Sequence, residues 1–162
     1  MQHQLTIRYR EYPSQSSLDP SDAELIQAAI RATEGSYSPY SNFRVGAAVR
    51  LANGTIVAGS NQENAAYPSG LCAERTALFA ASAQHPQCRD FDALAIVGRN
   101  AAGTLCEASP CGACRQAMLE YEQQQGHPMR ILWLTESGIR EVESVSDLLP
   151  FAFALSPTPD QP

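Results

Sequence analysis

The sequence predicts an α/β fold: a three-layer α/β/α sandwich built around a mixed five-stranded sheet. Segments with helical spacing of apolar residues alternate with short apolar segments typical of buried strands, in the order helix, hairpin, helix, strand, helix, strand, strand, helix. Helices that alternate with strands in this way usually cover both faces of a sheet. The chain of 162 residues is 44% hydrophobic and 17% charged, which is enough apolar material for one buried core.

The first half of the chain predicts a strand, a helix and a hairpin. Residues 4–10 form a short strand candidate, which a polar, proline-containing linker separates from the main body. The segment 23–35 has apolar residues at helical spacing and ends at a glycine, and Ser21 or Asp22 can cap its start. Residues 43–62 predict two strands joined by an Asn-Gly turn, which is a strong hairpin signal.

The second half predicts further helices and strands. A helix rich in Ala and Leu starts near Leu71, and another spans 112–126 and ends at a glycine. Three segments follow the strand pattern: 92–99, 130–135 and 139–144. Ser146 is expected to cap a short final helix over 147–153.

One domain is expected to occupy most of the chain. It spans residues 20–155 and follows an N-terminal extension, residues 1–19, to which the sequence assigns no role. Residues 156–162 are polar and rich in proline, so we expect a flexible tail there.

The charge balance argues against two classes of partner. The chain has 17 acidic and 11 basic residues, which gives a formal net charge of −6. Nucleic acids and anionic membranes are bound through clustered basic residues, and the sequence contains no such cluster. No stretch approaches the length of a membrane span, and the N-terminus has no signal-peptide core. We therefore expect a cytoplasmic protein with no nucleic-acid or membrane partner.

Three of the five cysteines lie where metal binding is favoured. Cys72 begins one predicted helix, and Cys111 and Cys114 begin another. The free N–H groups and the dipole at a helix N-terminus stabilise a thiolate. In a reducing compartment, clustered thiols bind metal or catalyse reactions rather than form disulfides. Three thiolates from two helix starts would give zinc three ligands and an open fourth position, which is typical of a catalytic site.

Glu74 distinguishes between the interpretations of this cysteine pattern. Cys-x-x-Cys alone also fits a redox disulfide, and its spacing is a weak signal. A carboxylate two residues after Cys72 can simply interact with the helix dipole. Beside an open zinc position it can instead take a proton from water and deliver it to a leaving group. The histidines, Cys88 and Cys106 are assigned ordinary solvated or packed roles.

Four blocks of sequence resemble one enzyme family. In chain order within residues 22–153 they are YSPYSNFRVGAAV, GSNQENAAYPSGLCAERTA, SPCGACRQAMLEY and DLLPFAF. Cys-Ala-Glu followed by Pro-Cys-x-x-Cys matches the zinc deaminase signature, with cysteine as the first ligand. The chain resembles the small, three-cysteine cytidine deaminases of pyrimidine salvage. Its first twenty or so residues lie outside the resemblance.

The resemblance implies an activity and a metal site. The activity is zinc-dependent hydrolysis of cytidine, and of 2′-deoxycytidine, to uridine or deoxyuridine plus ammonia, by a homotetramer, or alternatively a dimer, with one Zn²⁺ per subunit. The zinc ligands would be Cys72, Cys111 and Cys114. Glu74 would move protons between water and the pyrimidine. Three thiolates weaken zinc as a Lewis acid, so Arg75, or alternatively Arg115, would direct N–H groups at the sulfurs.

Candidate substrate contacts are spread over the chain. Asn61 and Glu63 end a predicted strand and share one face, and an amide beside a carboxylate suits the hydroxyls of a ribose. The resemblance implies three further contacts around the pyrimidine: Phe43, Ala73 and Phe153. It also implies that neighbouring subunits complete each site, with the Tyr67 region near those contacts.

Other functions remain open from the sequence. A deaminase for another aminated heterocycle could share the ribose pair. A structural zinc module that serves protein interaction would need a fourth protein ligand and would have no use for Glu74. Editing of cytosine within a polynucleotide would need clustered Lys and Arg, which the chain lacks.

Overall fold

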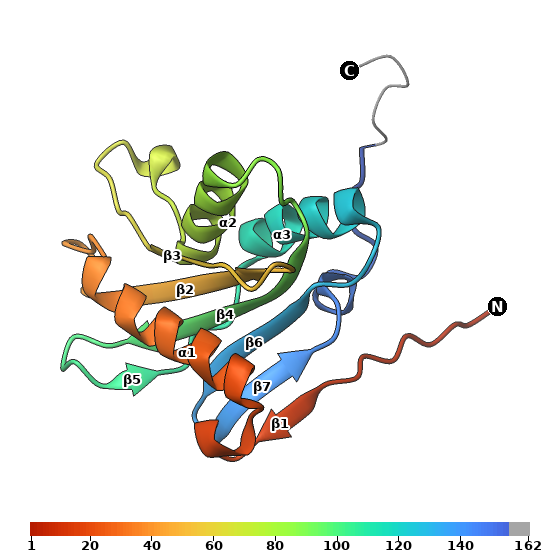
Figure 1. Ribbon diagram of the computed structural model, residues 1–162, viewed down its shortest axis with the longest axis horizontal. Coiled ribbons are helices and arrows are strands. Elements are labelled where there is room, and N and C mark those ends of the chain that lie inside the picture. The colour runs from red at the N-terminus through yellow and green to blue at the C-terminus, as the bar shows by residue number, and fades with distance from the viewer. Residues whose placement is uncertain (156–162) are drawn as a thin grey trace.

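A mixed sheet of seven strands forms the centre of the fold. The computed structural model describes residues 1–155, so the expected tail at 156–162 lies outside the described residues. The strands follow the order β1-β7-β6-β4-β2-β3, and β5 pairs with β4 (Figure 1). The bounds are β1 Arg10–Tyr12, β2 Arg44–Leu51, β3 Ile56–Ser60, β4 Phe91–Arg99, β5 Leu105–Cys106, β6 Arg130–Thr135 and β7 Gly138–Val142. β4 and β6 are parallel and the other pairs antiparallel, which confirms the mixed sheet.

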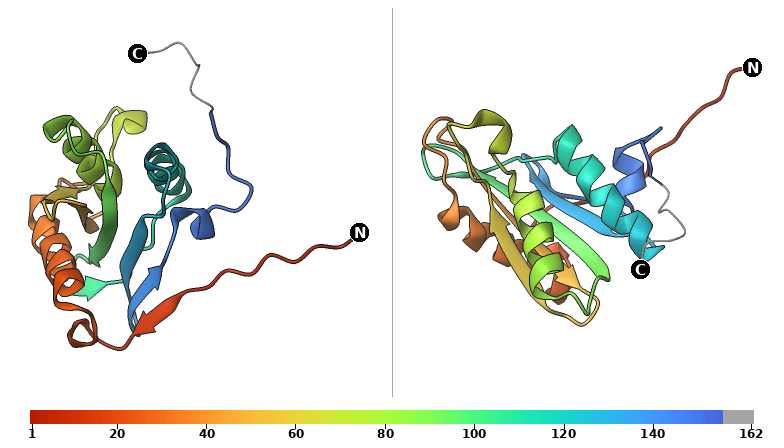
Figure 2. Two further views of the ribbon diagram at one scale, coloured as in Figure 1. Left: turned by 45° about the vertical axis from the view of Figure 1, so that its right-hand side comes forward. Right: turned by 90° about the horizontal axis from the view of Figure 1, so that it is seen from above.

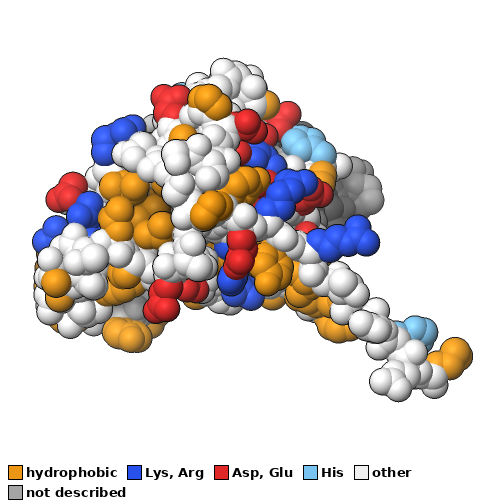
Figure 3. Space-filling model, turned by 90° about the horizontal axis from the view of Figure 1, so that it is seen from below, with side chains coloured by type: hydrophobic (Ala, Val, Ile, Leu, Met, Phe, Trp, Pro, Cys, Tyr) orange, Lys and Arg blue, Asp and Glu red, His pale blue; other side chains and the backbone are white. Residues whose placement is uncertain are grey.

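The predicted number of five strands is wrong, because the structure adds β1 and β5. Each is very short, three residues in β1 and two in β5, so neither can show a periodic pattern in the sequence. β1 exists through its antiparallel pairing with β7. Of the strand expected at 4–10, only Arg10 lies in β1. Residues 1–9 are exposed, and this segment extends away from the body (Figure 3).

Helices cover both faces of the sheet, which confirms the three-layer sandwich. α1 (Pro20–Ala32) packs on one face, and α2 (Ala73–Gln84) and α3 (Gly112–Gln125) pack on the other (Figure 2). Side chains alternate across the pleat. In β4, Ala95 therefore joins the core under α1, whereas Leu94 and Ile96 join the core under α2 and α3.

The predicted hairpin is confirmed, and it brings β3 against α2. Gly54 has φ +85°, the left-handed conformation that the turn requires. Farther along the hairpin, a Cβ atom at Gly59 would lie 2.4 Å from the backbone nitrogen of Ala77 in α2. Only glycine permits this approach, which fixes the height of α2 above the sheet.

Helix α1 begins three residues earlier than predicted. Its N-cap residue is Asp19, and Pro20 occupies the first helical position, where its missing N–H group costs nothing. Asp22, predicted as a possible cap, is buried instead. Its carboxylate accepts hydrogen bonds from Arg50 and Arg130, each with a shortest N–O distance of 2.7 Å. The choice between these roles was decided by partners far away in sequence.

The predicted final helix over 147–153 is wrong. This part of the chain instead forms a short 3₁₀ turn, η4 (Val145–Leu148), and the residue at its N-cap is Ser144, whose side chain accepts from Ser146 N–H. Pro150 cannot supply the N–H that a continuing helix needs. Phe151 has φ +56°, which takes the chain out of any helical path. Within residues 1–155, no helix has the length and apolar character needed to cross a membrane.

Candidate metal centre and active site

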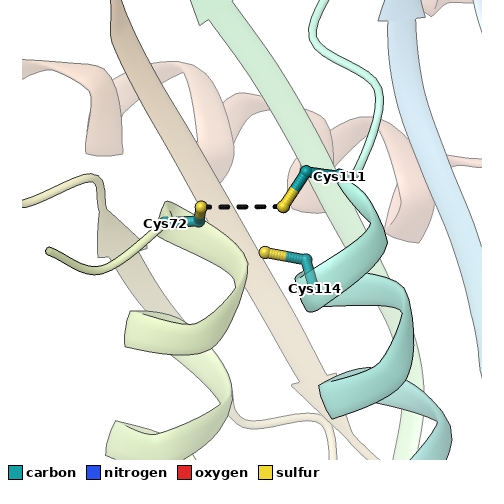
Figure 4. Close-up of side chains that lie close together, drawn as sticks. All are labelled: Cys72, Cys111 and Cys114. Atoms are coloured by element: carbon teal, nitrogen blue, oxygen red, sulfur yellow. Dashed lines mark hydrogen bonds between the residues drawn. The ribbon is translucent and has the colours of Figure 1, made fainter. Parts of the chain in front are cut away.

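The three predicted metal ligands meet between two helix starts. Cys72 is the N-cap residue of α2, Cys111 is the N-cap residue of α3, and Cys114 lies in the first turn of α3 (Figure 4). The sulfurs of Cys72 and Cys111 are 3.9 Å apart, and all three sulfurs lie within 4.8 Å of one another. Tetrahedral Zn–S bonds of about 2.3 Å place ligand sulfurs about 3.8 Å apart. The donor set and its spacing therefore fit zinc.

Without a metal, the thiols of this cluster do not all ionise equally readily. Hydrogen bonds from the Cys114 thiol and the Arg75 guanidinium lower the pKa of the Cys72 thiol to about 5, against the effect of burial. The hydrogen bond to Cys72 and burial raise the pKa of Cys114. A thiolate at Cys72 thus disfavours ionisation of the neighbouring Cys114 thiol. A bound dication would remove that conflict and favour all three thiolates.

A fourth protein ligand is not found near the three sulfurs in the described part of the chain. Among residues 1–155, the group of metal-ligating side chains holds only these cysteines. One of them, Cys114, is fully buried, whereas Cys111 is exposed. The geometry thus matches three ligands with an open position rather than the closed, four-ligand site expected of a structural zinc module.

Two arginines were candidates for donors to the sulfurs. Nη2 of Arg75 lies 3.7 Å from Sγ of Cys72 and 3.3 Å from the carbonyl oxygen of Gly70. Arg115 instead donates to two backbone carbonyls, those of Pro110 at 2.8 Å and Leu148 at 3.0 Å. Of the two arginines, Arg75 therefore has the geometry for reducing the charge on a ligand sulfur.

Glu74 lies beside the metal cluster. It is in the first turn of α2, and only 4% of it is exposed. Burial raises the pKa of its carboxyl, and the negative charge of Cys72 acts in the same direction. Both effects favour the protonated form of Glu74 more than in an exposed glutamate.

A cavity of about 620 Å³ opens in front of the cluster. Its wall includes Cys72, Cys111 and Glu74, together with most of the predicted substrate contacts: Phe43, Asn61, Glu63 and Ala73. The volume suits a small organic ligand. Among the described residues that line it there are two carboxylates, those of Glu63 and Glu74, and no Lys or Arg.

Asn61 is used largely by the protein itself. Its Oδ1 accepts hydrogen bonds from Ser36 Oγ at 2.6 Å and from the N–H of Val45 at 2.7 Å, and its Nδ2 donates to the carbonyl of Phe43 at 2.9 Å. These contacts hold the segment before β2 against the end of β3. Both lone pairs of Oδ1 are occupied, so a ligand can only receive the remaining N–H of Nδ2.

Glu63 is held by the same segment. Its carboxylate accepts from the hydroxyl of Ser41 and from the N–H of Tyr40 at 2.9 Å. These hydrogen bonds, from Ser41 first and then Tyr40, lower the pKa of the Glu63 carboxyl. Glu63 is therefore an anion and an acceptor at the mouth of the cavity.

Phe153 lies apart from the other predicted contacts. It is 66% exposed and does not line the cavity, and its carbonyl accepts from Gln116 Nε2 at 2.9 Å. Within one copy of the chain, the structure does not bring Phe153 to the site.

Several cavity residues were missed at the level of sequence: Tyr40, Ser41, Ile96, Ala108 and Ser109. Three of these fall inside blocks that carry the resemblance, Tyr40 and Ser41 in YSPYSNF and Ser109 in SPCGACR, so the resemblance offered a signal for them. Ile96 carried none, because an apolar residue in a strand has the same pattern whether it packs in a core or lines a cavity.

Comparison with known proteins gives a consistent result. A family model described as "Cytidine and deoxycytidylate deaminase zinc-binding region" matches residues 19–125. The cytidine deaminase of Halalkalibacterium halodurans is 45% identical over 129 residues, which is 80% of this chain and 91% of that protein. The cytidine deaminase of Sporosarcina psychrophila is 43% identical over 81% of this chain and 90% of its own length.

Solved structures with this fold carry the same name. The crystal structure of cytidine deaminase from Burkholderia pseudomallei is similar with a TM-score of 0.68 and 42% identity, covering 80% of this chain and 97% of that one. The crystal structure of cytidine deaminase from Mycobacterium tuberculosis has a TM-score of 0.64 and 34% identity, and the match covers 85% of this chain and 100% of that one.

Proposed function

This chain belongs to the cytidine and deoxycytidylate deaminase family, and on that premise we propose that it hydrolyses cytidine and 2′-deoxycytidine to uridine and deoxyuridine, releasing ammonia. One observation carries the proposal above the others. Three thiols from two helix starts converge on a cavity that Glu74 also lines. This is the arrangement that hydrolytic removal of an amino group needs: a metal with an open position and a proton carrier beside it.

Each residue has a task in this reaction. Cys72, Cys111 and Cys114 would hold Zn²⁺, which when bound supplies a Lewis acid that brings the pKa of water down to about 7. Glu74 accepts a proton from the attacking water and donates it to the ring nitrogen next to the carbon under attack. It then takes the proton of the newly formed hydroxyl group and passes it to the amino group, so that the C–N bond breaks and a carbonyl and ammonia are released. The N–H groups of Arg75 and of the two helix starts withdraw charge from the sulfurs.

The lining of the cavity supports a nucleoside over a nucleotide. A phosphate needs cationic or N–H donors, whereas the cavity wall offers carboxylates and no basic side chain among the described residues. Glu63 can accept from a ribose hydroxyl but would repel a phosphate. Polynucleotide is disfavoured for the same reason, and on the face seen in Figure 3 basic side chains lie among acidic ones.

The proposal extends to assembly, compartment and domain limits. A homotetramer would cover large exposed aromatics, among them Tyr67 at 91% and Phe153 at 66% exposure, and would bring Phe153 of one copy toward the site of another. The cytoplasm suits a protein whose five cysteines are all unpaired. We assign the catalytic domain to residues 20–155, with 1–19 as an extension that contributes β1.

Metal analysis and a substrate panel test this function together. The purified chain should contain about one zinc per subunit, the number that one three-thiolate site holds. Loss of ultraviolet absorbance is then followed with cytidine, deoxycytidine, cytosine, adenosine and deoxycytidylate. Turnover of the first two alone is expected. Faster turnover of another heterocycle would favour the alternative deaminase, and zinc without any turnover would favour a structural module. Gel filtration with light scattering should give the mass of four chains.

A further inference from the structure

One hydroxyl group joins two of the predicted substrate contacts. The side chain of Ser41 donates to Oε1 of Glu63 and accepts the backbone N–H of Phe43 at 3.0 Å. Its backbone N–H also reaches Oε2 of Glu63, at 3.3 Å. Ser41 thus connects the carboxylate expected to bind the sugar with the backbone of Phe43, the residue whose ring is expected beside the pyrimidine.

The turn that presents Ser41 is built for this contact. Asn42 adopts φ +53°, and its N–H bonds to the carbonyl of Ser38 at 3.0 Å, which closes the turn. Asparagine tolerates this left-handed conformation better than most residues. The closed turn directs the hydroxyl and the N–H of Ser41 toward the same carboxylate.

Glu63 needs such support because its side chain is only partly buried. A partly exposed glutamate still samples several rotamers, and ordering one of them to receive a ligand costs conformational entropy. A carboxylate has about four acceptor positions. Three donors from Tyr40 and Ser41 already occupy positions on Glu63, so roughly one position remains for a ligand in the cavity.

We propose that Ser41 is a positioning residue that sets the specificity of this site for the sugar: its hydroxyl holds the Glu63 carboxylate with one acceptor position toward the ribose hydroxyls. The inference rests on the proposed function and goes beyond it. It assigns sugar recognition to a side chain that touches the substrate only through Glu63. Loss of the hydroxyl should weaken binding of the sugar and leave metal binding and proton transfer intact.

The test compares Ser41→Ala, Ser41→Thr and the wild type on two substrates. Cytidine carries both sugar hydroxyls, and 2′,3′-dideoxycytidine carries neither. Ser41→Ala should raise KM for cytidine about tenfold, the effect of losing a hydrogen bond to a charged group, with kcat changed less than about threefold. With dideoxycytidine the change in kcat/KM should stay below about twofold. Ser41→Thr keeps the hydroxyl and should restore most of the affinity.

A control and a double variant separate positioning from general damage. Ser16→Ala removes an exposed hydroxyl that does not line the cavity and, among residues 1–155, bonds to Ser14, so it should change neither KM nor kcat. Zinc content and melting temperature should be equal in all variants. In a Glu63→Ala background, Ser41→Ala should lower kcat/KM for cytidine by less than about a further twofold, because the two residues act as one unit.

The possible failures are distinguishable. Suppose that the wild type is active but that Ser41→Ala lowers kcat/KM equally for both substrates, or leaves kcat/KM for cytidine unchanged. Either result would overturn this inference alone. A zinc-loaded wild type that does not deaminate cytidine would overturn the proposed function and the inference with it.

Discussion

At the scale of single residues, the decisive feature is the position of Glu74. Glu74 is the second residue of α2, and the N-cap residue of that helix, Cys72, is a proposed zinc ligand. The helix start therefore sets how far the Glu74 carboxylate lies from the sulfur of Cys72. Burial raises the pKa of this carboxyl above that of an exposed glutamate.

Replacing this carboxylate tests its role directly. Glu74→Gln keeps the shape of the side chain and removes the proton-accepting oxygen, so zinc content should be unchanged while kcat falls about 10²–10⁴-fold, the range of general acid–base catalysis. Metal analysis and steady-state kinetics with cytidine measure the two effects. Glu24→Gln, an exposed change on α1, is the matched control. Turnover close to that of the wild type would remove Glu74 from the mechanism.

At the scale of elements, the metal centre depends on how closely α2 lies on the hairpin. Gly59 of β3 faces the backbone of Ala77, and the same helix carries Cys72 at its start. The other two proposed ligands, Cys111 and Cys114, lie at the start of α3, which packs beside α2. A change in the height of α2 therefore separates the sulfurs.

A methyl group at Gly59 should disturb the protein and its metal together. Gly59→Ala places Cβ within 2.4 Å of the backbone nitrogen of Ala77, and such overpacking costs about 1–3 kcal/mol of unfolding free energy. Zinc affinity should fall as well, since the two helix starts move apart. Thermal unfolding and competition with a chelator measure both quantities. Ala58→Ser, at an exposed position of the same strand, should alter neither; a Gly59→Ala protein with normal zinc affinity would contradict the link.

At the scale of the whole molecule, two buried carboxylates tie the layers together. Asp22 of α1 accepts from Arg50 of β2 and from Arg130 of β6. Glu122 of α3 accepts from the N–H groups of Met129 at 2.9 Å and Val145 at 2.8 Å, and from two serine hydroxyls. For each carboxyl, burial opposes ionisation, but these hydrogen bonds outweigh it and lower the pKa.

These lowered pKa values predict a loss of stability in acid. Unfolded Asp and Glu titrate near pH 3.9 and about 4.3, and their folded counterparts here titrate lower, so the stabilisation is complete above about pH 5. It should disappear as the pH falls through the folded pKa values, because protons then bind the unfolded state more readily. Urea unfolding at pH 7, 5, 4 and 3 should show this decline.

One variant assigns part of that decline to Glu122. Glu122→Gln cannot ionise and should lower the free energy of unfolding by about 1–3 kcal/mol at pH 7, with the difference from wild type shrinking toward pH 3. Loss of zinc in acid affects both proteins and cancels in the comparison. Glu136→Gln, in the exposed turn after β6, serves as the control. A difference that stays constant with pH would contradict the assignment.

The long elements could be predicted from the chain, and the short ones could not. α2, α3, the hairpin, β4 and β6 have enough residues for a period to appear, and their predicted positions agree with the structure within a few residues. β1 and β5 exist only through pairing with a neighbouring strand. The ligand residues share a recognisable spacing, whereas Ser41 has no local signal for its contact with Glu63, since the two lie 22 residues apart.

The sequence by itself determined the family, the metal type and the identity of the chemical groups, because thiols at two helix starts and an adjacent carboxylate are properties of short segments. Only the tertiary structure decided which groups meet. It brought Cys72 to Cys111 across 39 residues, gave Arg75 rather than Arg115 a sulfur to bind, and took Asp22 from a helix cap into the interior. The physical reason is that hydrogen bonding and burial depend on partners that only packing brings within reach.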